Sequence, residues 1–370
     1  MPEIILKKIT KRFGDFVAVD NLDLVIDDGD FVTLLGPSGC GKTTTLRQIA
    51  GLETPSEGEI YIDGQLVYSS EKRVDIPPAK REVGFLFQNY ALWPHMTVNQ
   101  NIAFGLENLK WSKEDIKKRV DELLALLRIE EFGGRYPAEL SGGQQQRVAI
   151  ARTLATHPKV LLMDEPLSNL DAKLRMEMRA ELKRLHRETG ATFVYVTHDQ
   201  LEAMTLATKI CLLDDGELQQ YAPPLTVYMK PANLFVATFV GNPTINLVEF
   251  NGAVESEKTV ALNNPSISFR FTAGDSLKDM KDGKMTIGFR PEFISISQDS
   301  KLLADVVSSL PSGMETILQL QVENLSFSSV VFGSLDFPIG SKIPISFTGN
   351  NFVLFDSDGK FRSCGSVELV

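Results

Sequence analysis

The feature that most constrains this chain is a glycine-rich segment, GPSGCGKTT, at residues 36–44. It matches the pattern G-x-x-x-x-G-K-[ST], follows the apolar run DFVTLL (30–35) and precedes a stretch with helical character. A buried strand that exits into such a loop and then a helix indicates a phosphate-binding loop of an α/β domain. The alternative is a glycine-rich turn that binds nothing, but a loop of this kind between a buried strand and a helix seldom has a role other than phosphate binding.

The residue types of this loop fit the chemistry of a nucleotide phosphate. Gly36, Gly39 and Gly41 allow backbone N–H groups to curl around phosphate oxygens with no Cβ in the way. The helix that follows directs its N-terminus at the anion. We expect Lys42 to reach the β- and γ-phosphates and Thr43 to ligate Mg²⁺.

An acidic pair in VLLMDEP (160–166) completes this site. Four apolar residues carry the chain through a sheet, and Asp164 and Glu165 follow at the carboxyl end of the strand, where open α/β sheets place their chemistry. We expect Asp164 to hold Mg²⁺ through water and Glu165 to act as the general base on the attacking water. The alternative is a strand end capped by solvated acids, but the phosphate loop in the same domain favours the catalytic interpretation.

A second anion-binding helix start occurs in LSGGQQQRVAIARTL (140–154). Ser141, Gly142 and Gly143 open this helix, and its first turn offers N–H groups to an anion. Because one nucleotide site already has its own phosphate loop, a second anion site makes sense if it serves the nucleotide of another molecule. A two-fold dimer arranges two copies in this way.

Hydrophobic periodicity divides the chain into two regions. Strand and helix patterns alternate over about the first 235 residues and predict a largely parallel α/β sheet, with helices over 114–127 and 172–190 and a hairpin over 209–221. A linker-like segment with three prolines follows. Beyond about residue 240, short alternating runs predict a small β-barrel or sandwich with no strong helix.

Composition limits the classes of partner. The 370 residues carry a formal net charge of −10, which makes nucleic acid an unfavourable main partner. Three scattered cysteines indicate a reducing compartment rather than a disulfide framework. No apolar run approaches the ~20 residues that cross a bilayer, and the N-terminus lacks the apolar core of a signal peptide. Any membrane role therefore has to work through partner chains.

Taken in order, the motifs resemble those of ATP-binding cassette (ABC) ATPases. They are GPSGCGKTT, Gln88 in GFLFQNYALWPHMTV, LSGGQQQR, VLLMDEP, SNLD and VTHDQ. The resemblance implies a P-loop NTPase of the α/β class with a RecA-like core, a helical subdomain at about 89–157 and an antiparallel β-subdomain, together over 1–235. It implies a C-terminal all-β, OB-like regulatory domain over 236–370.

The same resemblance implies roles for individual residues. Phe13 would stack on the adenine of ATP, Gln88 would contact Mg²⁺ or the lytic water, and His198 would contact the γ-phosphate and orient that water. Asp171 would shape the dimer interface, although Asn169 stands where the SNLD segment commonly has alanine. The ATP-binding set expected besides Phe13 is Gly36, Pro37, Ser38, Gly39, Cys40, Gly41, Lys42, Thr43, Thr44, Ser141, Gly142, Gly143 and Gln144. Catalysis is expected from Glu165, His198 and Gln88, and Mg²⁺ binding from Thr43, Gln88 and Asp164.

The segments around the motifs resemble those of importers. NYALWPHMTVNQNIAFGL (89–106) is similar to the surface that docks a transmembrane subunit, and 228–249 is similar to the joint of carbohydrate-uptake ATPases of the maltose type. The resemblance implies a homodimeric ATPase beneath two transmembrane permease subunits, peripheral on the cytoplasmic face of the membrane, supplied by an external solute-binding protein. Sugars are the favoured solutes; polyamines, ferric iron and glycerol phosphate remain alternatives, as does an ABC ATPase without a transporter.

Overall fold

The computed structural model describes residues 3–370, and contacts within the chain divide it into a first unit that ends at Pro224 and a second unit of Leu225–Val370. The predicted limits, 1–235 and 236–370, place the boundary later. The difference concerns the residues just after Pro224, which fold with the second unit. The first two residues of the predicted cassette lie outside the described range.

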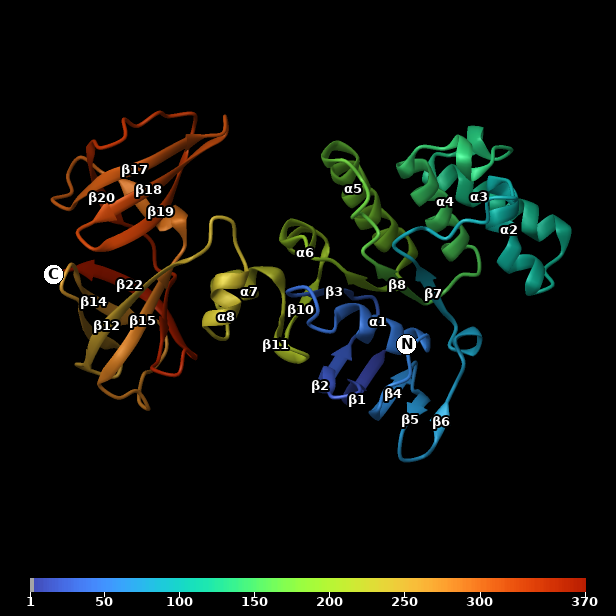
Figure 1. Cartoon of the computed structure of the whole chain (residues 1–370), viewed down its shortest axis with the longest axis horizontal. Helices are drawn as coiled ribbons and strands as arrows, with labels where there is room; N and C mark the ends of the chain where they lie inside the picture. Colours follow the sequence, from blue (N-terminus) through green and yellow to red (C-terminus); the bar gives the residue numbers. More distant parts are fainter. Residues whose placement is uncertain (1–2) are drawn as a thin grey trace. The chain divides into compact units, whose positions relative to one another are not determined.

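The first unit contains two sheets and the helices that cover them (Figure 1). Its strands are β1 (Ile4–Phe13), β2 (Phe16–Ile26), β3 (Phe31–Leu35), β4 (Glu57–Ile62), β5 (Gln65–Ser69), β6 (Val74–Asp75), β7 (Val83–Leu86), β8 (Val160–Asp164), β9 (Thr192–Val196), β10 (Lys209–Asp214) and β11 (Glu217–Ala222). Its helices are α1 (Lys42–Ala50), α2 (Val98–Asn108), α3 (Lys113–Leu127), α4 (Gly142–Leu154), α5 (Ala172–Thr189) and α6 (Gln200–Leu206), with short 3₁₀ turns at Pro78–Lys80, Glu130–Phe132 and Pro137–Glu139.

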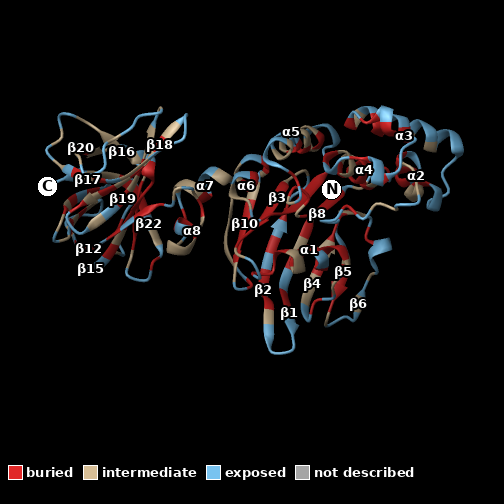
Figure 2. Cartoon of the chain, turned by 45° about the horizontal axis from the view of Figure 1, so that its top comes forward, coloured by how far each residue is buried: buried red, intermediate tan, exposed pale blue. Residues whose placement is uncertain are grey.

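The central sheet has the strand order β11-β10-β3-β9-β8-β7 and is parallel except for the β10–β11 hairpin. Both faces of its middle strands are buried, as the red strands of Figure 2 show. Along β8, Leu161 and Met163 join one apolar cluster, whereas Val160 and Leu162 join the other. Burial on both faces explains why these strands are continuous apolar runs rather than alternating ones.

A second, antiparallel sheet in the order β2-β1-β4-β5-β6 lies within the first 75 residues. The alternation of strand and helix patterns predicts a largely parallel domain and does not reveal this sheet; only the family resemblance implies it. Apolar residues of one face, such as Ile4, Leu6 and Ile60, pack into the same cluster as α1 and one face of the central sheet. The antiparallel sheet therefore encloses the helix that follows the phosphate loop.

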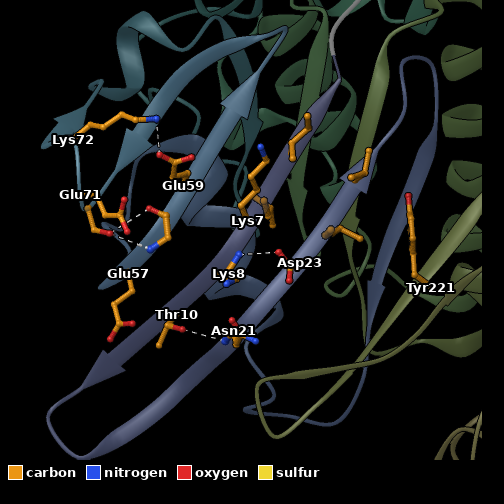
Figure 3. Close-up of a pocket in the computed structure, with 16 residues that line it drawn as sticks. Lys7, Lys8, Thr10, Asn21, Asp23, Glu57, Glu59, Glu71, Lys72 and Tyr221 are labelled. Carbon is orange, nitrogen blue, oxygen red and sulfur yellow. Dashed lines mark hydrogen bonds and ion pairs between the residues drawn. The ribbon is translucent and has the colours of Figure 1, made fainter.

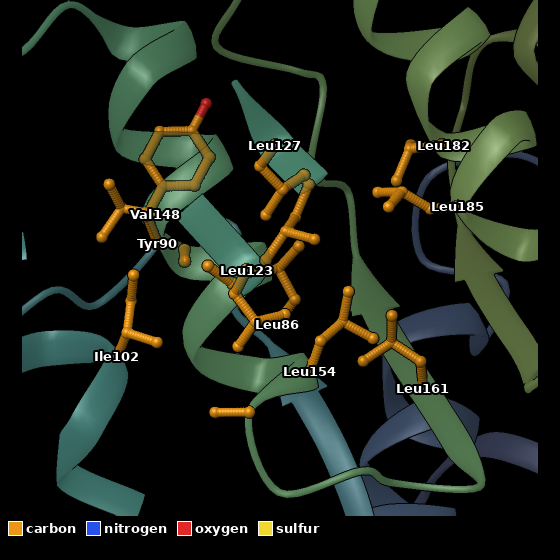
Figure 4. Close-up of a cluster of buried hydrophobic side chains, with 14 of the residues drawn as sticks. Leu86, Tyr90, Ile102, Leu123, Leu127, Val148, Leu154, Leu161, Leu182 and Leu185 are labelled. Atoms are coloured by element: carbon orange, nitrogen blue, oxygen red, sulfur yellow. The ribbon is translucent and has the colours of Figure 1, made fainter. Parts of the chain in front are cut away.

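The helices α2, α3 and α4 form a group of their own beside the central sheet (Figure 1). Val120, Leu123, Leu124 and Leu127 of α3 are buried at helical spacing, as the sequence predicts. Figure 4 shows Leu123 and Leu127 in one cluster with Leu86, Val148 and Leu154. The apolar faces of these helices thus place the start of α4 and the segment after β7.

The second unit is built almost wholly of strands. They are β12 (Asn246–Val254), β13 (Thr259–Asn263), β14 (Ser268–Ala273), β15 (Gly283–Phe289), β16 (Ile294–Ile296), β17 (Leu303–Pro311), β18 (Glu315–Val322), β19 (Leu325–Phe332), β20 (Lys342–Phe347), β21 (Phe352–Phe355) and β22 (Phe361–Leu369). The order β12-β13-β14-β22-β21-β15 closes a barrel, and a further sheet has the order β16-β20-β17-β18-β19. The barrel agrees with the predicted all-β domain. Phenylalanine rings join the two sheets in one apolar cluster, in which Phe347 of β20 lies edge-on to Phe269 and Phe289 of the barrel.

The proline-bearing segment before the barrel, which the sequence indicates is linker-like, has a regular structure of its own. It folds into two short helices, α7 (Pro224–Met229) and α8 (Leu234–Phe239). Arg290 is only 2% exposed. Its guanidinium donates to the carbonyl oxygens of Tyr228, Ala237 and Val240 and lies 4.0 Å from the Tyr228 ring centroid. One buried cation thus holds both helices on the barrel, which the prolines alone do not reveal.

Among the described residues, every helix falls short of the length and apolar character that a membrane crossing requires.

Candidate active site

The phosphate loop connects β3 to α1, as the motif predicts. Gly41 has φ 97°, and a Cβ there would lie 2.3 Å from the carbonyl oxygen of Ala18, so only glycine fits. Lys42 is 7% exposed, and its ammonium donates to the carbonyl oxygens of Gly36 (2.8 Å) and Pro37 (2.7 Å). The carbonyl oxygens of the loop therefore hold the Lys42 side chain against the loop, at the N-terminus of α1.

The two oxygen groups expected to hold Mg²⁺ lie side by side. The Thr43 hydroxyl donates to Asp164 Oδ1 at 2.9 Å, although the two residues are 121 positions apart. Arg47 contacts the other carboxylate oxygen of Asp164 at 3.3 Å. A hydroxyl and a carboxylate are the ligand types that Mg²⁺ accepts, so these two side chains fit that ion.

The three residues expected to take part in hydrolysis converge at the carboxyl ends of neighbouring strands. Gln88 follows β7, Glu165 follows β8 and His198 follows β9. Gln88 Nε2 donates to Glu165 Oε2 at 3.4 Å, and His198 Nδ1 lies 3.4 Å from Glu165 Oε1. The Glu165 N–H donates to the Val196 carbonyl oxygen at 3.1 Å. The sheet register thus brings a carboxylate, an amide and an imidazole to one point.

The start of α4 has the geometry of a capped helix. Ser141 is the N-cap: its hydroxyl accepts from the Gln144 N–H at 3.4 Å, and Gln144 Oε1 accepts from the Ser141 N–H at 2.8 Å. Ser141 and Gly142 are exposed. Gly143 is buried, and a Cβ there would lie 2.6 Å from the side chain of Leu174 in α5, so a larger residue would require that leucine to move. Ser141 and Gln144 bond with each other rather than with the phosphate loop of the same chain.

Three other predicted site residues lie at the edges of this arrangement. Phe13 ends β1 with 49% of its surface exposed and with the Lys11 ammonium 4.8 Å from its ring centroid. Asp171 caps α5, because its side chain accepts from the Leu174 N–H at 3.0 Å. Cys40 is buried inside the loop, and this burial raises the pKa of its thiol although the nearby Lys42 ammonium opposes the shift.

Sequence reasoning missed two neighbours of the residues that are expected to bind Mg²⁺ and to take part in hydrolysis. Arg47 lies four residues after Thr43 on α1, so helical spacing already puts it on the same face. Ser168 donates from its hydroxyl to the Glu165 carbonyl oxygen and accepts from Gln88 Nε2 at 3.3 Å. Ser168 begins the SNLD segment three residues after the predicted base, and this position could have indicated its proximity to Glu165.

A groove of about 1150 Å³ lies elsewhere, on the antiparallel sheet (Figure 3). Lys7, Lys8, Asp23, Glu59 and Lys72 line it, and several of these charges pair, as in the Lys72–Glu59 contact of 2.9 Å. None of the predicted nucleotide-binding residues lines this groove. Its size therefore does not mark it as the active site.

A family model described as ABC transporter matches residues 19–168. A xylose/arabinose import ATP-binding protein of Haloferax volcanii is 44% identical, over 97% of this chain and 94% of the relative. A maltose/maltodextrin import ATP-binding protein of Vibrio vulnificus is 42% identical, over 98% and 97%. An Fe(3+) ions import ATP-binding protein of Fusobacterium nucleatum is 43% identical, over 96% and 93%.

A solved structure resembles the first part of the chain. It is a dimeric ATP-binding cassette in a post-hydrolysis state, bound to ADP and Pi, with a TM-score of 0.52 and 38% identity. The match covers 60% of this chain and 98% of the solved one.

Proposed function

This chain belongs to the ATP-binding proteins of ABC transporters, and we propose that it energises the import of a sugar or oligosaccharide. It binds ATP and is an ATPase of that family. The observation that carries the proposal is the extent of the similarity. Several relatives that are named for the import of xylose/arabinose or maltose match nearly the whole chain, the second unit included, whereas one relative named for iron import matches it to a similar extent.

We infer that the loop of residues 36–44 holds the phosphates of ATP. The Lys42 ammonium donates to the carbonyl oxygens of Gly36 and Pro37. When ATP binds, the same N–H donors would turn to phosphate oxygens, because an ammonium has three donors and can bond with either kind of oxygen. The exposed ring of Phe13 is available to stack on adenine. Thr43 and Asp164 would hold Mg²⁺, which would add a divalent positive charge to the site, and Gln88 would be a further contact of that ion.

Glu165 is the proposed general base. Its carboxylate side chain is 23% exposed, so a water molecule can approach it, and its two contacts at 3.4 Å leave capacity to accept a proton. His198, with a 61% exposed side chain, would orient that water and contact the terminal phosphate. Gln88 would hold the other oxygen of Glu165.

We propose that two copies form a two-fold dimer, since the Ser141 helix start is exposed and bonds with no part of its own phosphate loop. Ser141, Gly142, Gly143 and Gln144 of one copy would meet the nucleotide on the other, and the segment around Asp171 would shape the interface. Closure on ATP and reopening after hydrolysis would drive the partner subunits.

The proposed permease-docking surface is the segment 89–106. Trp93 packs on Phe104 with ring centroids 4.2 Å apart, and the Arg152 guanidinium lies 4.8 Å from the Trp93 centroid. Arg152 also donates to the carbonyl oxygens of Tyr90 and Ala91. The α4 helix therefore contacts this segment directly. This segment would pass the closure and reopening of the dimer to a pair of permease subunits, beneath which the chain would lie at the cytoplasmic face of the membrane. An external solute-binding protein would deliver the solute to those subunits.

The test is solute uptake by cells that lack this chain and are complemented with either the parent or Glu165→Gln. We expect the parent alone to restore the uptake of labelled xylose, arabinose or maltose, and permease subunits to co-purify with both forms. The iron relative supports a second candidate. Restored uptake of Fe³⁺ without any sugar would refute the sugar proposal and favour an iron importer.

A further inference from the structure

One arginine joins the two segments that flank the proposed catalytic group. Arg175 lies in the first turn of α5, directly after the segment of residues 168–171. Its Nη2 donates to the Leu170 carbonyl oxygen at 3.1 Å, and its Nη1 donates to Asp199 Oδ2 at 3.3 Å. Leu170 belongs to the segment proposed to face the other copy, and Asp199 is the residue after His198. A single guanidinium thus bridges both segments.

The segment around His198 is held on its inner side by a buried carboxylate. Glu202 is 3% exposed, and its Oε2 accepts from the hydroxyls of Tyr195 and Thr197, both at 2.7 Å. The Thr197 hydroxyl in turn accepts from the Asp199 N–H at 3.0 Å. Burial raises the pKa of Glu202, while its hydrogen bonds and the nearby Arg175 oppose that shift. His198 therefore lies between two residues, Thr197 and Asp199, that this network fixes.

Arg175 has donor capacity left over. Its Nε is buried without a hydrogen-bond partner and lies 4.0 Å from Glu202 Oε1. A shift of about 1 Å would bring this pair to hydrogen-bond distance. A movement of the 168–171 segment would pull on the same guanidinium through the Leu170 carbonyl.

We propose that Arg175 is a positioning residue for ATP hydrolysis, which transmits the position of the 168–171 segment to His198 through Asp199 and Glu202. The inference rests on the proposed roles of His198 and Glu165. A plain surface ion pair is the simpler interpretation, but such pairs contribute little stability. That interpretation gives no reason for one guanidinium to contact both segments beside the proposed base.

The experiment measures phosphate release by the full chain across a range of Mg·ATP concentrations. We expect Arg175→Ala to lower kcat by between about 10- and 100-fold, the range found where groups that orient a catalytic ligand are removed. The KM for ATP should change less than about twofold, because Arg175 contacts neither the phosphate loop nor Phe13. Arg175→Lys should restore part of the rate, since lysine keeps the charge but lacks the planar fork that spans two acceptors.

Two further variants keep the test decisive. Asp199→Asn removes the charge opposite Arg175 and keeps an oxygen that can cap α6, so it should lower kcat in the same direction even if Arg175→Ala folds poorly. Arg187→Ala, an exposed position on the same helix, is the matched control and should leave kcat unchanged. An unchanged kcat in both Arg175→Ala and Asp199→Asn would overturn the proposal.

A double-mutant cycle separates this inference from the function on which it rests. If Arg175 acts through His198, the double variant of Arg175→Ala and His198→Ala should be no slower than His198→Ala alone. Multiplied losses would overturn the positioning role while leaving the proposed role of His198 intact. If His198→Ala itself keeps the parent rate, the proposed catalytic group fails instead, and the positioning role fails with it.

Discussion

Replacing Glu165 by glutamine tests the centre of the proposed chemistry. The amide is close to the carboxylate in shape, so it can keep one of the two contacts at 3.4 Å, with Gln88 or with His198. What it cannot do is take a proton from water. Loss of a positioned general base costs about 10²–10⁴-fold in rate, which corresponds to about 2.7–5.4 kcal/mol in the activation free energy.

The assay is phosphate release by the full chain at saturating Mg·ATP, with nucleotide binding measured separately in the cold. We expect the Glu165→Gln chain to bind ATP as tightly as the parent, because Lys42 and the rest of the loop are unchanged. Since its ATP persists, we also expect an ATP-dependent dimer to accumulate, which size-exclusion chromatography detects.

The matched control for this change is Glu177→Gln, at an exposed position on α5, which should leave turnover unchanged. The reasoning would be refuted if Glu165→Gln hydrolysed ATP at close to the parent rate. A loss of ATP binding in proportion to the loss of turnover would also contradict it, because the residue would then act on the ground state rather than on the proton transfer.

Three other changes test separate parts of the structure. Lys42→Ala should weaken ATP binding by at least about tenfold, because it removes a charge-assisted contact; tight binding in an equilibrium assay would count against the loop. Ser141→Arg should abolish hydrolysis, because Ser141 of one copy is proposed to contact the nucleotide of the other, while each monomer should still bind ATP; unaltered phosphate release would show that Ser141 has no such role. Arg290→Ala should destabilise the second unit by about 3 kcal/mol or more, since three carbonyl oxygens lose a charged donor; an unchanged urea midpoint for that unit would show that the helices are held otherwise.

Much of the local structure could be predicted because it depends on residues close in sequence. The spacing of apolar residues predicts α3, and Gly190, with φ 62°, ends α5 as a left-handed C-cap should. The hairpin of β10 and β11 turns at Asp215 and Gly216, both with positive φ, as expected from that dipeptide. In each case the signal and the structure lie within one turn or one element.

Two features of the fold could not be predicted, because they depend on contacts between elements that are distant in sequence. The prolines after residue 222 suggested a linker-like segment, but the chain forms α7 and α8 there, and Arg290, more than fifty positions later, donates to their carbonyl oxygens. The antiparallel sheet also escaped the periodicity argument, because alternating strands and helices predict parallel pairing and do not say which early strands pair with one another.

The sequence by itself determined which chemical groups this protein carries and in what local setting: a phosphate loop between a strand and a helix, acids at a strand end, and a serine that caps a helix. These depend on short-range backbone geometry, which neighbouring residues specify. Only the tertiary structure decided that Gln88, Glu165 and His198 meet at one point and that Arg175 bridges two of the segments beside them. Those contacts join positions up to 77 apart, and they depend on the order and register of strands in the sheet, which no local pattern specifies.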